Sequence, residues 1–513
     1  MRRLEPRLPA PSASPAGTPA PPLAGGRPSG PAPLPSPALL AFLLVAFSAV
    51  LHVVVAGLIP LTPQEAYYWQ YARHPALSYF DHPPLAAWTI RAFTLLFGDG
   101  ERAIRLAAAF WSSVFSLFFF LAGRRLFGSR VALLSTAGML VVPFFSLGQT
   151  VITPDGPLVA GWVAAFYFTI RALQEERGAW LLAAGAATGL ASLGKYTGFL
   201  LAPQILLALL LDRRGRRMLA GPWPYLALAV AAAIFSPVVA WNATHGWKSF
   251  GFQFAQRGAG MRRFQWVLTG RFLALQALAV SPLLFLVLLA AVAAAVRRWR
   301  DPAMRLCALF SAPLLLLLVA VSPLHWVKMN WAAPVYPGAL LVAVALLVAH
   351  PVRWRGLMIG TVAVAALGTV YLTLFPLVPA LPFPARDATT SGWKELAARV
   401  EAERRADPTL PVVGCFYRTA STLAFYLAGR PETFSSNAFG EPGLAYDDWG
   451  DPASLAGREV LVVLDDRDAD WCRNRAERCQ PLEPLEPLEV WRGPDRVTTF
   501  RLWRCRYLGP PPR

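Results

Sequence analysis

The sequence predicts a polytopic α-helical membrane protein with a small α/β domain at its C-terminal end. Of its 513 residues, 55% are hydrophobic and only 15% are charged, which is too apolar for an ordinary soluble multidomain protein. Apolar runs of roughly 20 residues, the length that crosses a bilayer, recur as far as residue 380. The net charge of +18 comes from short arginine clusters between these runs, a pattern typical of membrane topology and not of nucleic-acid binding.

Residues 1–36 consist mainly of Pro, Ala, Ser and Gly with a few Arg. Such a composition cannot bury enough apolar surface to become ordered, so we expect a disordered cytoplasmic tail. The apolar run from Pro37 is long enough to span, and no small-residue cleavage site clearly ends it. A cleaved signal peptide is therefore not expected.

Residues 37–380 are predicted to form the transmembrane domain, with about eleven spans. These begin near residues 37, 103, 131, 155, 179, 197, 222, 271, 303, 331 and 356. Alternate connections carry the arginines and are therefore expected in the cytoplasm: Arg124, Arg125 and Arg130; Arg171 and Arg177; Arg213, Arg214, Arg216 and Arg217; Arg297, Arg298, Arg300 and Arg305; Arg353 and Arg355. An odd number of spans starting inside places the loop 61–101 and the C-terminal domain in the periplasm.

Residues 386–513 are predicted to be a periplasmic α/β domain. Helical patterns ("GWKELAARVEAERR", "TASTLAFYLAG") alternate with short strand patterns ("PVVGCFY", "REVLVVLDD"), and "PLEPLEPLEV" is typical of a loop that leads into a strand. The segment also holds Cys415, Cys472, Cys479 and Cys505. These are expected to form two disulfides in an oxidising compartment, the alternative being four unpaired buried thiols.

The loop 61–101 carries the first candidate carboxylates. Glu65 follows Thr62 and Pro63 in a capping-box pattern, so it is expected either to cap a helix, to act in a site, or to do both. The helix that follows holds four aromatic side chains suited to the lipid headgroup layer, and we expect it to lie along the membrane surface: Tyr67, Tyr68, Trp69 and Tyr71.

Asp81 is the second candidate. A capping Asp accepts from the amides two and three residues on, but Pro83 and Pro84 have no N–H. The segment therefore predicts a rigid presentation of the Asp81 carboxylate and the His82 imidazole. The alternative is a structural ion pair with Arg73 or a neighbour.

Asp155 either caps a span, as Thr153 also could, or belongs to the site. Lys195, Lys248 and Lys328 stand at predicted outer ends of spans, where the topology signal does not require them. With the arginines of the same layer they could hold a lipid phosphate, or they could simply extend to headgroups: Arg257, Arg262, Arg263 and Arg271. The spacing of His and Cys residues predicts no metal site.

Several longer motifs carry a family resemblance. "QEAYYWQYARHPALSYFDHPPLAAW", "ITPDGPL", "GLASLGKYTGFLLAP", "SPVVAWNATHGWKSFGFQ" and "KMNWAAPVYPG" resemble the bacterial members of glycosyltransferase family 39. These are related to the protein O-mannosyltransferases and to the lipid A aminoarabinose transferase, and share the GT-C fold. The resemblance covers residues from about 40 to 375 in the same order; the C-terminal domain resembles periplasmic domains of some relatives more weakly.

The resemblance implies an inverting transfer of a sugar from a polyprenyl-phosphate carrier, undecaprenyl phosphate being the expected one. The acceptor, which is lipid A, a glycan or a protein, would lie at the periplasmic face of the inner membrane. A carboxylate would take the acceptor's proton, and cations would stabilise the departing phosphate. No cofactor or nucleic-acid partner is expected, and a divalent metal is left open.

Relatives usually have an Asp-Glu pair in the first loop, whose Asp is the expected base, but this chain has Gln64 and Glu65. A neutral amide cannot accept the proton. We therefore expect Asp81 and Glu65 to act jointly, with Asp155 as third candidate, and we place four further residues at the donor phosphate: Lys195, Lys328, His82 and Arg257. A multispan transporter and a non-catalytic binder of lipid-linked sugar are the alternative functions.

Overall fold

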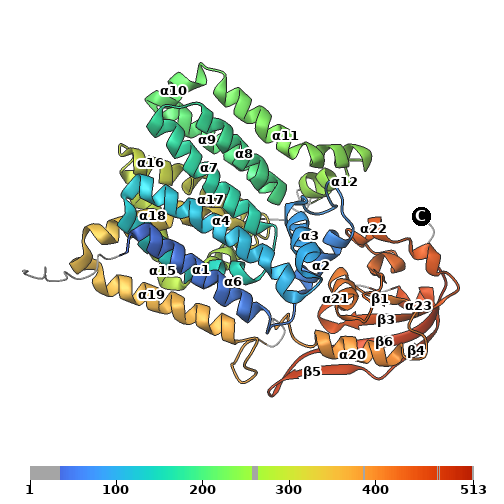
Figure 1. Ribbon diagram of the computed structural model, residues 1–513. Coiled ribbons are helices and arrows are strands. Elements are labelled where there is room, and N and C mark those ends of the chain that lie inside the picture. Colours follow the sequence, from blue (N-terminus) through green and yellow to red (C-terminus); the bar gives the residue numbers. More distant parts are fainter. Residues whose placement is uncertain (1–34, 257–263, 385–387, 471, 473, 511–513) are drawn as a thin grey trace, which may run out of the picture. The chain divides into compact units, whose positions relative to one another are not determined.

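The computed structural model describes residues 35–256, 264–384, 388–470, 472 and 474–510 (Figure 1). Its membrane part consists of helices, and its C-terminal part contains a β-sheet. This arrangement confirms the predicted fold class of a helical membrane protein with a small α/β domain.

Seven segments in the described residues are long and apolar enough to span a membrane: α1 (Pro37–Ala56), α4 (Glu101–Phe127), α7 (Asp155–Glu175), α11 (Trp223–Thr244), α16 with α17 (Pro302–Val321), η3 with α18 (Met329–Ala349) and α19 (Pro351–Leu374). Three bent pairs raise this number to ten if each is one span: α5 (Ser129–Leu140) with α6 (Pro143–Thr150), η1 (Tyr196–Leu200) and α9 (Leu201–Leu211) with α10 (Arg213–Leu219), and α14 (Trp266–Val280) with α15 (Pro282–Arg297). The predicted eleven spans are not confirmed, because α8 (Ala179–Gly194) has only 16 residues.

Prolines explain two of the three bends. Pro143 and Pro282 stand at the first position of α6 and α15, where they cannot donate a backbone hydrogen bond to the preceding helix. The third bend has a side-chain cause, since Asp212 caps α10 by accepting from the amides of Arg214 and Gly215.

Two short helices fill the loop between α1 and α4: α2 (Pro63–Arg73) and α3 (Leu85–Phe97). The predicted capping box opens α2. The Thr62 hydroxyl accepts from the amide of Glu65 at 3.2 Å, and the Glu65 carboxylate accepts from the amide of Thr62 at 2.9 Å. The sequence pattern alone was sufficient here because both partners lie within one helical turn.

The C-terminal sheet has the strand order β2-β1-β3-β6-β4, with β5 also paired to β6. Its strands are β1 (Val412–Gly414), β2 (Thr433–Phe434), β3 (Glu459–Asp465), β4 (Cys479–Pro484), β5 (Leu488–Arg492) and β6 (Asp495–Tyr507), and its main helices are α20 (Trp393–Glu403) and α21 (Tyr417–Tyr426). In the repeat at 481–490, residues 485–487 form the expected loop that leads into the strand β5, but residues 481–484 already belong to β4. The prolines and acidic residues of the repeat favour turns, but pairing of β4 and β5 with β6 stabilises strands there.

Short helical turns complete the chain: α12 (Lys248–Phe250), η2 (Gly251–Gln256), η5 (Ser436–Phe439), α22 (Tyr446–Trp449), η6 (Pro452–Leu455), η7 (Asp466–Asp468) and α23 (Arg475–Arg478). Two of these turns, α22 and α12, contribute contacts near the candidate site. The turn α22 of the C-terminal domain packs its aromatic rings against α2, and Lys248 of α12 binds the C-terminal domain.

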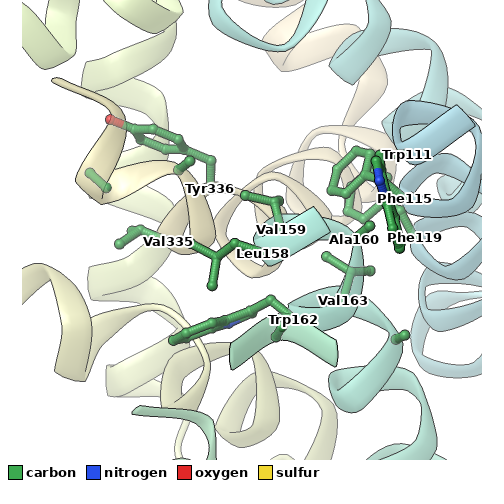
Figure 2. Close-up of a cluster of buried hydrophobic side chains, with 14 of the residues drawn as sticks. Trp111, Phe115, Phe119, Leu158, Val159, Ala160, Trp162, Val163, Val335 and Tyr336 are labelled. Carbon is green, nitrogen blue, oxygen red and sulfur yellow. The ribbon is translucent and has the colours of Figure 1, made fainter. Parts of the chain in front are cut away.

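The largest hydrophobic core packs α4 against α7 (Figure 2). Trp111, Phe115 and Phe119 of α4 are at most 8% exposed, and Trp162 of α7 is 1% exposed. The same core includes aromatic residues of α2 and, from the C-terminal domain, Phe425 and Tyr446. The first loop and the C-terminal domain therefore share one core with the membrane helices.

Two disulfides are present in the C-terminal domain, as the even number of cysteines predicts. Cys415 is bonded to Cys472, and Cys479 is bonded to Cys505. Cys307, buried in α16 (Pro302–Leu309), is the remaining cysteine. Pairing brings together segments 57 and 26 residues apart, which restricts the unfolded chain.

Alkylation of the unfolded protein tests this pairing. Without reductant, we expect a thiol reagent to modify Cys307 alone, because the other four cysteines are oxidised. With reductant, all five cysteines should be modified, and intact-mass spectrometry reads both states. A Cys307→Ser variant, as the control, should take up no reagent until reductant is added. Modification of five sites without reductant would contradict the pairing.

Candidate active site

Helix α2 lies between the membrane helices and the C-terminal domain, and its aromatic side chains are buried. Tyr67, Trp69 and Tyr71 are each 1% exposed, and Tyr68 is 4% exposed. The expectation that these rings lie in the lipid headgroup layer is wrong, because protein covers them. The ring of Tyr67 lies 4.4 Å from that of Tyr417, and the ring of Trp69 lies 5.0 Å from that of Phe425.

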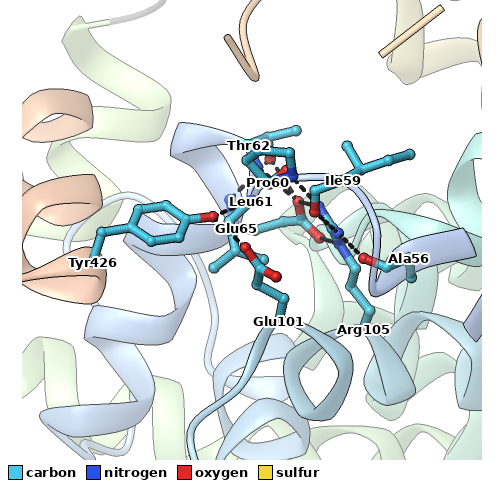
Figure 3. Close-up of polar contacts among 9 residues, drawn as sticks. All are labelled: Ala56, Ile59, Pro60, Leu61, Thr62, Glu65, Glu101, Arg105 and Tyr426. Atoms are coloured by element: carbon cyan, nitrogen blue, oxygen red, sulfur yellow. Dashed lines mark hydrogen bonds and ion pairs between the residues drawn. The ribbon is translucent and has the colours of Figure 1, made fainter. Parts of the chain in front are cut away.

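Glu65 forms a buried ion pair with Arg105 of α4 (Figure 3). Arg105 Nε donates to Oε1 and Nη2 to Oε2, both at 2.9 Å. The same guanidinium also donates to the backbone carbonyls of Ile59 and Pro60, which lie between α1 and α2. Glu65 is fully buried, and both of its carboxylate oxygens accept hydrogen bonds. This geometry favours a structural role for Glu65 and leaves its oxygens poorly placed to take a proton.

Asp81 lies in a pocket of tyrosine hydroxyls. Tyr67 Oη donates to Asp81 Oδ1 at 3.1 Å, and Tyr71 Oη also donates to Oδ1. The residue is 7% exposed. Burial and the nearby Asp81 charge raise the pKa of both phenols well above the ordinary value, so they remain protonated donors. The alternative ion pair with Arg73 is not formed, since Arg73 bonds to Glu432 of the C-terminal domain at 2.7 Å.

His82 stands next to this carboxylate, with Nε2 3.9 Å from Asp81 Oδ2. Gln253 donates to the Asp81 backbone carbonyl at 2.6 Å, which fixes the main chain of the loop. The carboxylate and the imidazole thus lie side by side, as predicted, on a segment whose main chain is bound by Gln253. Its role in catalysis remains a prediction.

Asp155, Lys195 and Asn330 form a second polar cluster. Lys195 Nζ donates to Asp155 Oδ1 at 2.7 Å, and Asn330 Nδ2 donates to Oδ2 at 2.6 Å. Within the described residues, the start of α7 has no side-chain cap, so the alternative role for Asp155 or Thr153 as a cap is wrong. Burial raises the pKa of Tyr68 well above its usual value, and the charges of Asp81 and Asp155 are among the groups that raise it further. Tyr68 is thus within electrostatic range of both clusters.

The remaining predicted cations are distributed differently. Lys328 immediately precedes the η3 turn (Met329–Val335), two residues before Asn330. Lys248 forms an ion pair with Asp448 of the C-terminal domain. Arg271 lies over the ring of Trp326, 4.6 Å from its centroid. Arg257, Arg262 and Arg263 lie outside the described residues, and the proposed role of Arg257 stays a prediction.

A cavity of about 470 Å³ lies between α1, α4, α6, α7 and α19. Its walls are largely apolar and include Trp111, Phe115, Phe144 and Phe145. Polar groups gather among its lining residues, namely Arg105, Asp155 and Asn330. The cavity therefore offers an apolar space next to a carboxylate that is paired with a lysine, an arrangement suited to a ligand with a lipid chain and a charged head.

Sequence reasoning missed Arg105, Tyr67, Tyr71 and Tyr417 as site residues. The sequence did contain a signal for Arg105, because burying the charge of an arginine within an apolar run costs free energy, and such an arginine commonly has a partner. The tyrosines had none, since aromatic residues at a membrane boundary suggest headgroup contacts first. Tyr417 donates to Gln64 Oε1 at 2.8 Å across more than 350 residues of sequence.

In the part of the chain that the structure describes, no group of three or more His, Cys, Asp or Glu side chains could hold a metal ion. The carboxylates of Asp81, Glu65 and Asp155 have Tyr, Arg, Lys and Asn partners. The prediction of no metal site in the sequence, with a divalent metal left open, stays a prediction.

Comparison with known proteins agrees with these features. Residues 81–241 match the family described as dolichyl-phosphate-mannose-protein mannosyltransferase. The lipid A galacturonosyltransferase RgtD of Rhizobium johnstonii is 27% identical over 354 residues, which is 67% of this chain and 71% of that protein.

Solved structures show the same fold. ArnT from Cupriavidus metallidurans in the apo state superposes with a TM-score of 0.66 at 19% identity, over 91% of this chain and 98% of ArnT. The same protein bound to undecaprenyl phosphate gives a TM-score of 0.60 at 18% identity, over 90% of this chain and 97% of that one. These structures show that the chain has the ArnT-like GT-C fold, and the family match and the curated relative are glycosyltransferases that it resembles.

Proposed function

We propose that the chain transfers a sugar from a polyprenyl-phosphate carrier to lipid A, with inversion at the anomeric carbon. The observation that carries this proposal is the Asp155–Lys195 pair, whose carboxylate also lines the apolar cavity between the membrane helices. A lipid-linked sugar needs an apolar space for its chain and charged groups for its phosphate. The names of two relatives, a lipid A galacturonosyltransferase and an ArnT that binds undecaprenyl phosphate, support the acceptor and the carrier. A glycan or a protein is the alternative acceptor.

Asp81 is the proposed general base. Its carboxylate takes the proton from the acceptor hydroxyl while the acceptor oxygen attacks the anomeric carbon. The bond from that carbon to the phosphate oxygen breaks, and the carrier leaves as a polyprenyl phosphate. Glu65 is proposed as a positioning residue, because its oxygens already bind Arg105 and Thr62.

Cations are proposed to stabilise the phosphate as it leaves. Lys195 is held in place by Asp155. Lys328 precedes Asn330 of this cluster by two residues in the sequence, and His82 Nε2 lies 3.9 Å from Asp81 Oδ2. Arg257 completes the proposed set. Asp155 then serves to orient Lys195 and is itself fixed by Asn330.

The cavity is proposed to hold the first isoprene units of the carrier. Ser116 of α4 is 3% exposed and lines this cavity. We expect Ser116→Phe to fill part of the space and to raise the KM for the lipid donor by roughly ten-fold, the scale of overpacking a formed site. The kcat at saturating donor should change less. Donor titration in a transfer assay measures both constants.

Ser113→Phe is the matched control, since Ser113 belongs to the same helix but is not among the cavity-lining residues. A KM that rises equally in both variants would argue against the cavity as the carrier site.

The protein is proposed to lie in the bacterial inner membrane with its N-terminus in the cytoplasm. The loop 61–101 and the C-terminal domain would then face the periplasm, and the two disulfides support an oxidising compartment for that domain. A cysteine introduced at an exposed position of the loop, as in Leu77→Cys, should react with a membrane-impermeant thiol reagent in intact spheroplasts. Labelling only after lysis would reverse the proposed orientation.

A direct transfer assay tests the function. The purified full chain in nanodiscs is given lipid A and radiolabelled undecaprenyl-phosphate sugars, including the galacturonosyl and aminoarabinosyl forms. We expect label to move to lipid A and undecaprenyl phosphate to be released, whereas nucleotide sugars give no product. In a parallel assay with the chain in proteoliposomes, label that crosses the vesicle membrane without transfer would support a transporter. Label that binds without either outcome would support a non-catalytic binder.

A further inference from the structure

We propose that the C-terminal domain completes the active site by orienting Tyr67, whose hydroxyl in turn positions Asp81. This inference rests on the proposed role of Asp81 as the base. It assigns a function to a domain whose contribution to sugar transfer the fold alone does not explain, and it makes Tyr67 a positioning residue.

The hydrogen bonds of Tyr67 carry the argument. The backbone amide of Ala445, in the C-terminal domain, donates to Tyr67 Oη at 3.1 Å. A phenol has a single proton, and an oxygen that accepts from an amide directs this proton elsewhere. Asp81 Oδ1 lies 3.1 Å away and is an ionisable acceptor. The amide of Ala445 therefore turns the Tyr67 hydroxyl toward Asp81.

Tyr71 strengthens the same arrangement. Its hydroxyl contacts both Asp81 Oδ1 and Tyr67 Oη, the latter at 3.2 Å. Because a hydrogen bond to a carboxylate is stronger than one to a neutral phenol, its proton goes to Asp81. Oδ1 thus receives two phenolic donors, and both come from α2.

Contacts on both sides of Ala445 fix the position of its amide. The hydroxyl of Tyr446 receives a hydrogen bond from Gln70 of α2 at 3.3 Å and lies 2.9 Å from Ser421 Oγ. Further along the domain, Tyr417 donates to Gln64, and Glu432 pairs with Arg73. The domain is therefore held along the whole length of α2, and the Ala445 amide cannot shift independently of that helix.

The charged and titratable groups that face Asp81 come from several elements. His82 is its sequence neighbour, Tyr67 and Tyr71 donate to it, and the remaining phenols within electrostatic range are Tyr68, Tyr196 and Tyr417. Burial, more than any other cause, raises the pKa of the three phenols of α2 and of Tyr417, so these four side chains are neutral at the pH of the assay. Loss of one donor then acts on the carboxylate alone: its charged form is less stable, and it binds a proton at a higher pH.

Tyr67→Phe in the full-length enzyme tests the inference, because it removes the hydroxyl and keeps the ring packing. We expect kcat/KM for transfer to fall by roughly ten-fold or more, the scale of a hydrogen bond to a charged group. The acid limb of the pH–rate profile should move to higher pH. Tyr426→Phe is the control: it removes a phenol that also joins the C-terminal domain to the first loop, through Leu61 and Glu101, but does not touch Asp81. Its acid limb should stay in place.

The link through the domain is tested by Ala445→Pro, which deletes the donating amide at a residue whose φ of −67° suits proline. The acid limb should move in the same direction as in Tyr67→Phe, and the double variant should show no further shift. An unmoved acid limb in Tyr67→Phe overturns the inference, as does an Ala445→Pro shift of equal size with and without the Tyr67 hydroxyl. Full activity of Asp81→Asn would instead refute the proposed base, whatever Tyr67 does.

Discussion

Asp81→Asn should lower the rate of sugar transfer by roughly 10²- to 10⁴-fold, the usual contribution of a general base. The amide cannot take the proton of the acceptor hydroxyl. Its Oδ1 can still accept from Tyr67 and Tyr71, so the loop should keep its conformation. The measurement is single-turnover transfer from undecaprenyl-phosphate sugar to lipid A, with thermal unfolding in detergent to verify that the protein is folded.

Asp99→Asn provides the matched control. Asp99 lies in the same loop, accepts from Trp69 Nε1 at 2.9 Å and pairs with Arg430, but its contacts are on the far side of α2 from Asp81 and its side chain is 39% exposed. We expect activity within a few-fold of the original protein, since exposed ion pairs contribute about 0–1 kcal/mol. Equal losses in both variants, or full activity in Asp81→Asn, would remove Asp81 as the base.

The sequence could predict features whose partners lie nearby. The capping box at Thr62 and Glu65 needed only one helical turn, and Asp81 was singled out because the two prolines after it lack amides. The positions where spans begin follow from apolar runs, and the two disulfides follow from an even number of cysteines in one segment. The resemblance to glycosyltransferase family 39 was likewise carried by contiguous motifs.

The partners of the site residues could not be predicted, because they come from distant parts of the chain. Residues of the C-terminal domain cover the rings of α2, and from the sequence alone these rings are equally suited to lipid headgroups. The short α8 shows a related limit: its apolar composition indicates a span, and in this fold α7 and α11 both pack against its 16 residues. Composition indicates burial, and it does not indicate whether lipid or protein provides it.

Gln64 is a further residue whose partner could not be predicted from the sequence. Where relatives are expected to carry an Asp, the carboxamide of Gln64 accepts from Tyr417 of the C-terminal domain at 2.8 Å. The position thus takes part in holding the domain on α2. The same domain thus contacts Gln64 through Tyr417 and donates to the Tyr67 hydroxyl beside Asp81 through the amide of Ala445.

Glu65→Gln should lower the free energy of unfolding by about 3–5 kcal/mol, the cost of leaving a buried charge without its partner. Arg105 is 1% exposed, and its guanidinium would remain charged beside a neutral amide. Its hydrogen bonds to the carbonyls of Ile59 and Pro60 compensate only in part. Thermal or denaturant unfolding in detergent measures the loss, and transfer activity should fall with the folded fraction rather than through a moved acid limb.

Two further variants separate this ion pair from a general effect of charge. In Glu65→Gln with Arg105→Met, the unpaired charge is gone, so the double variant should be more stable than the sum of the single losses predicts. Glu176→Gln removes an exposed partner of Arg217, at 2.9 Å, and should cost at most about 1 kcal/mol. If Glu65→Gln costs no more than Glu176→Gln, the pair does not hold the first loop to α4, and Glu65 becomes available again as a catalytic acid or base. A small stability loss together with a moved acid limb would assign it that role.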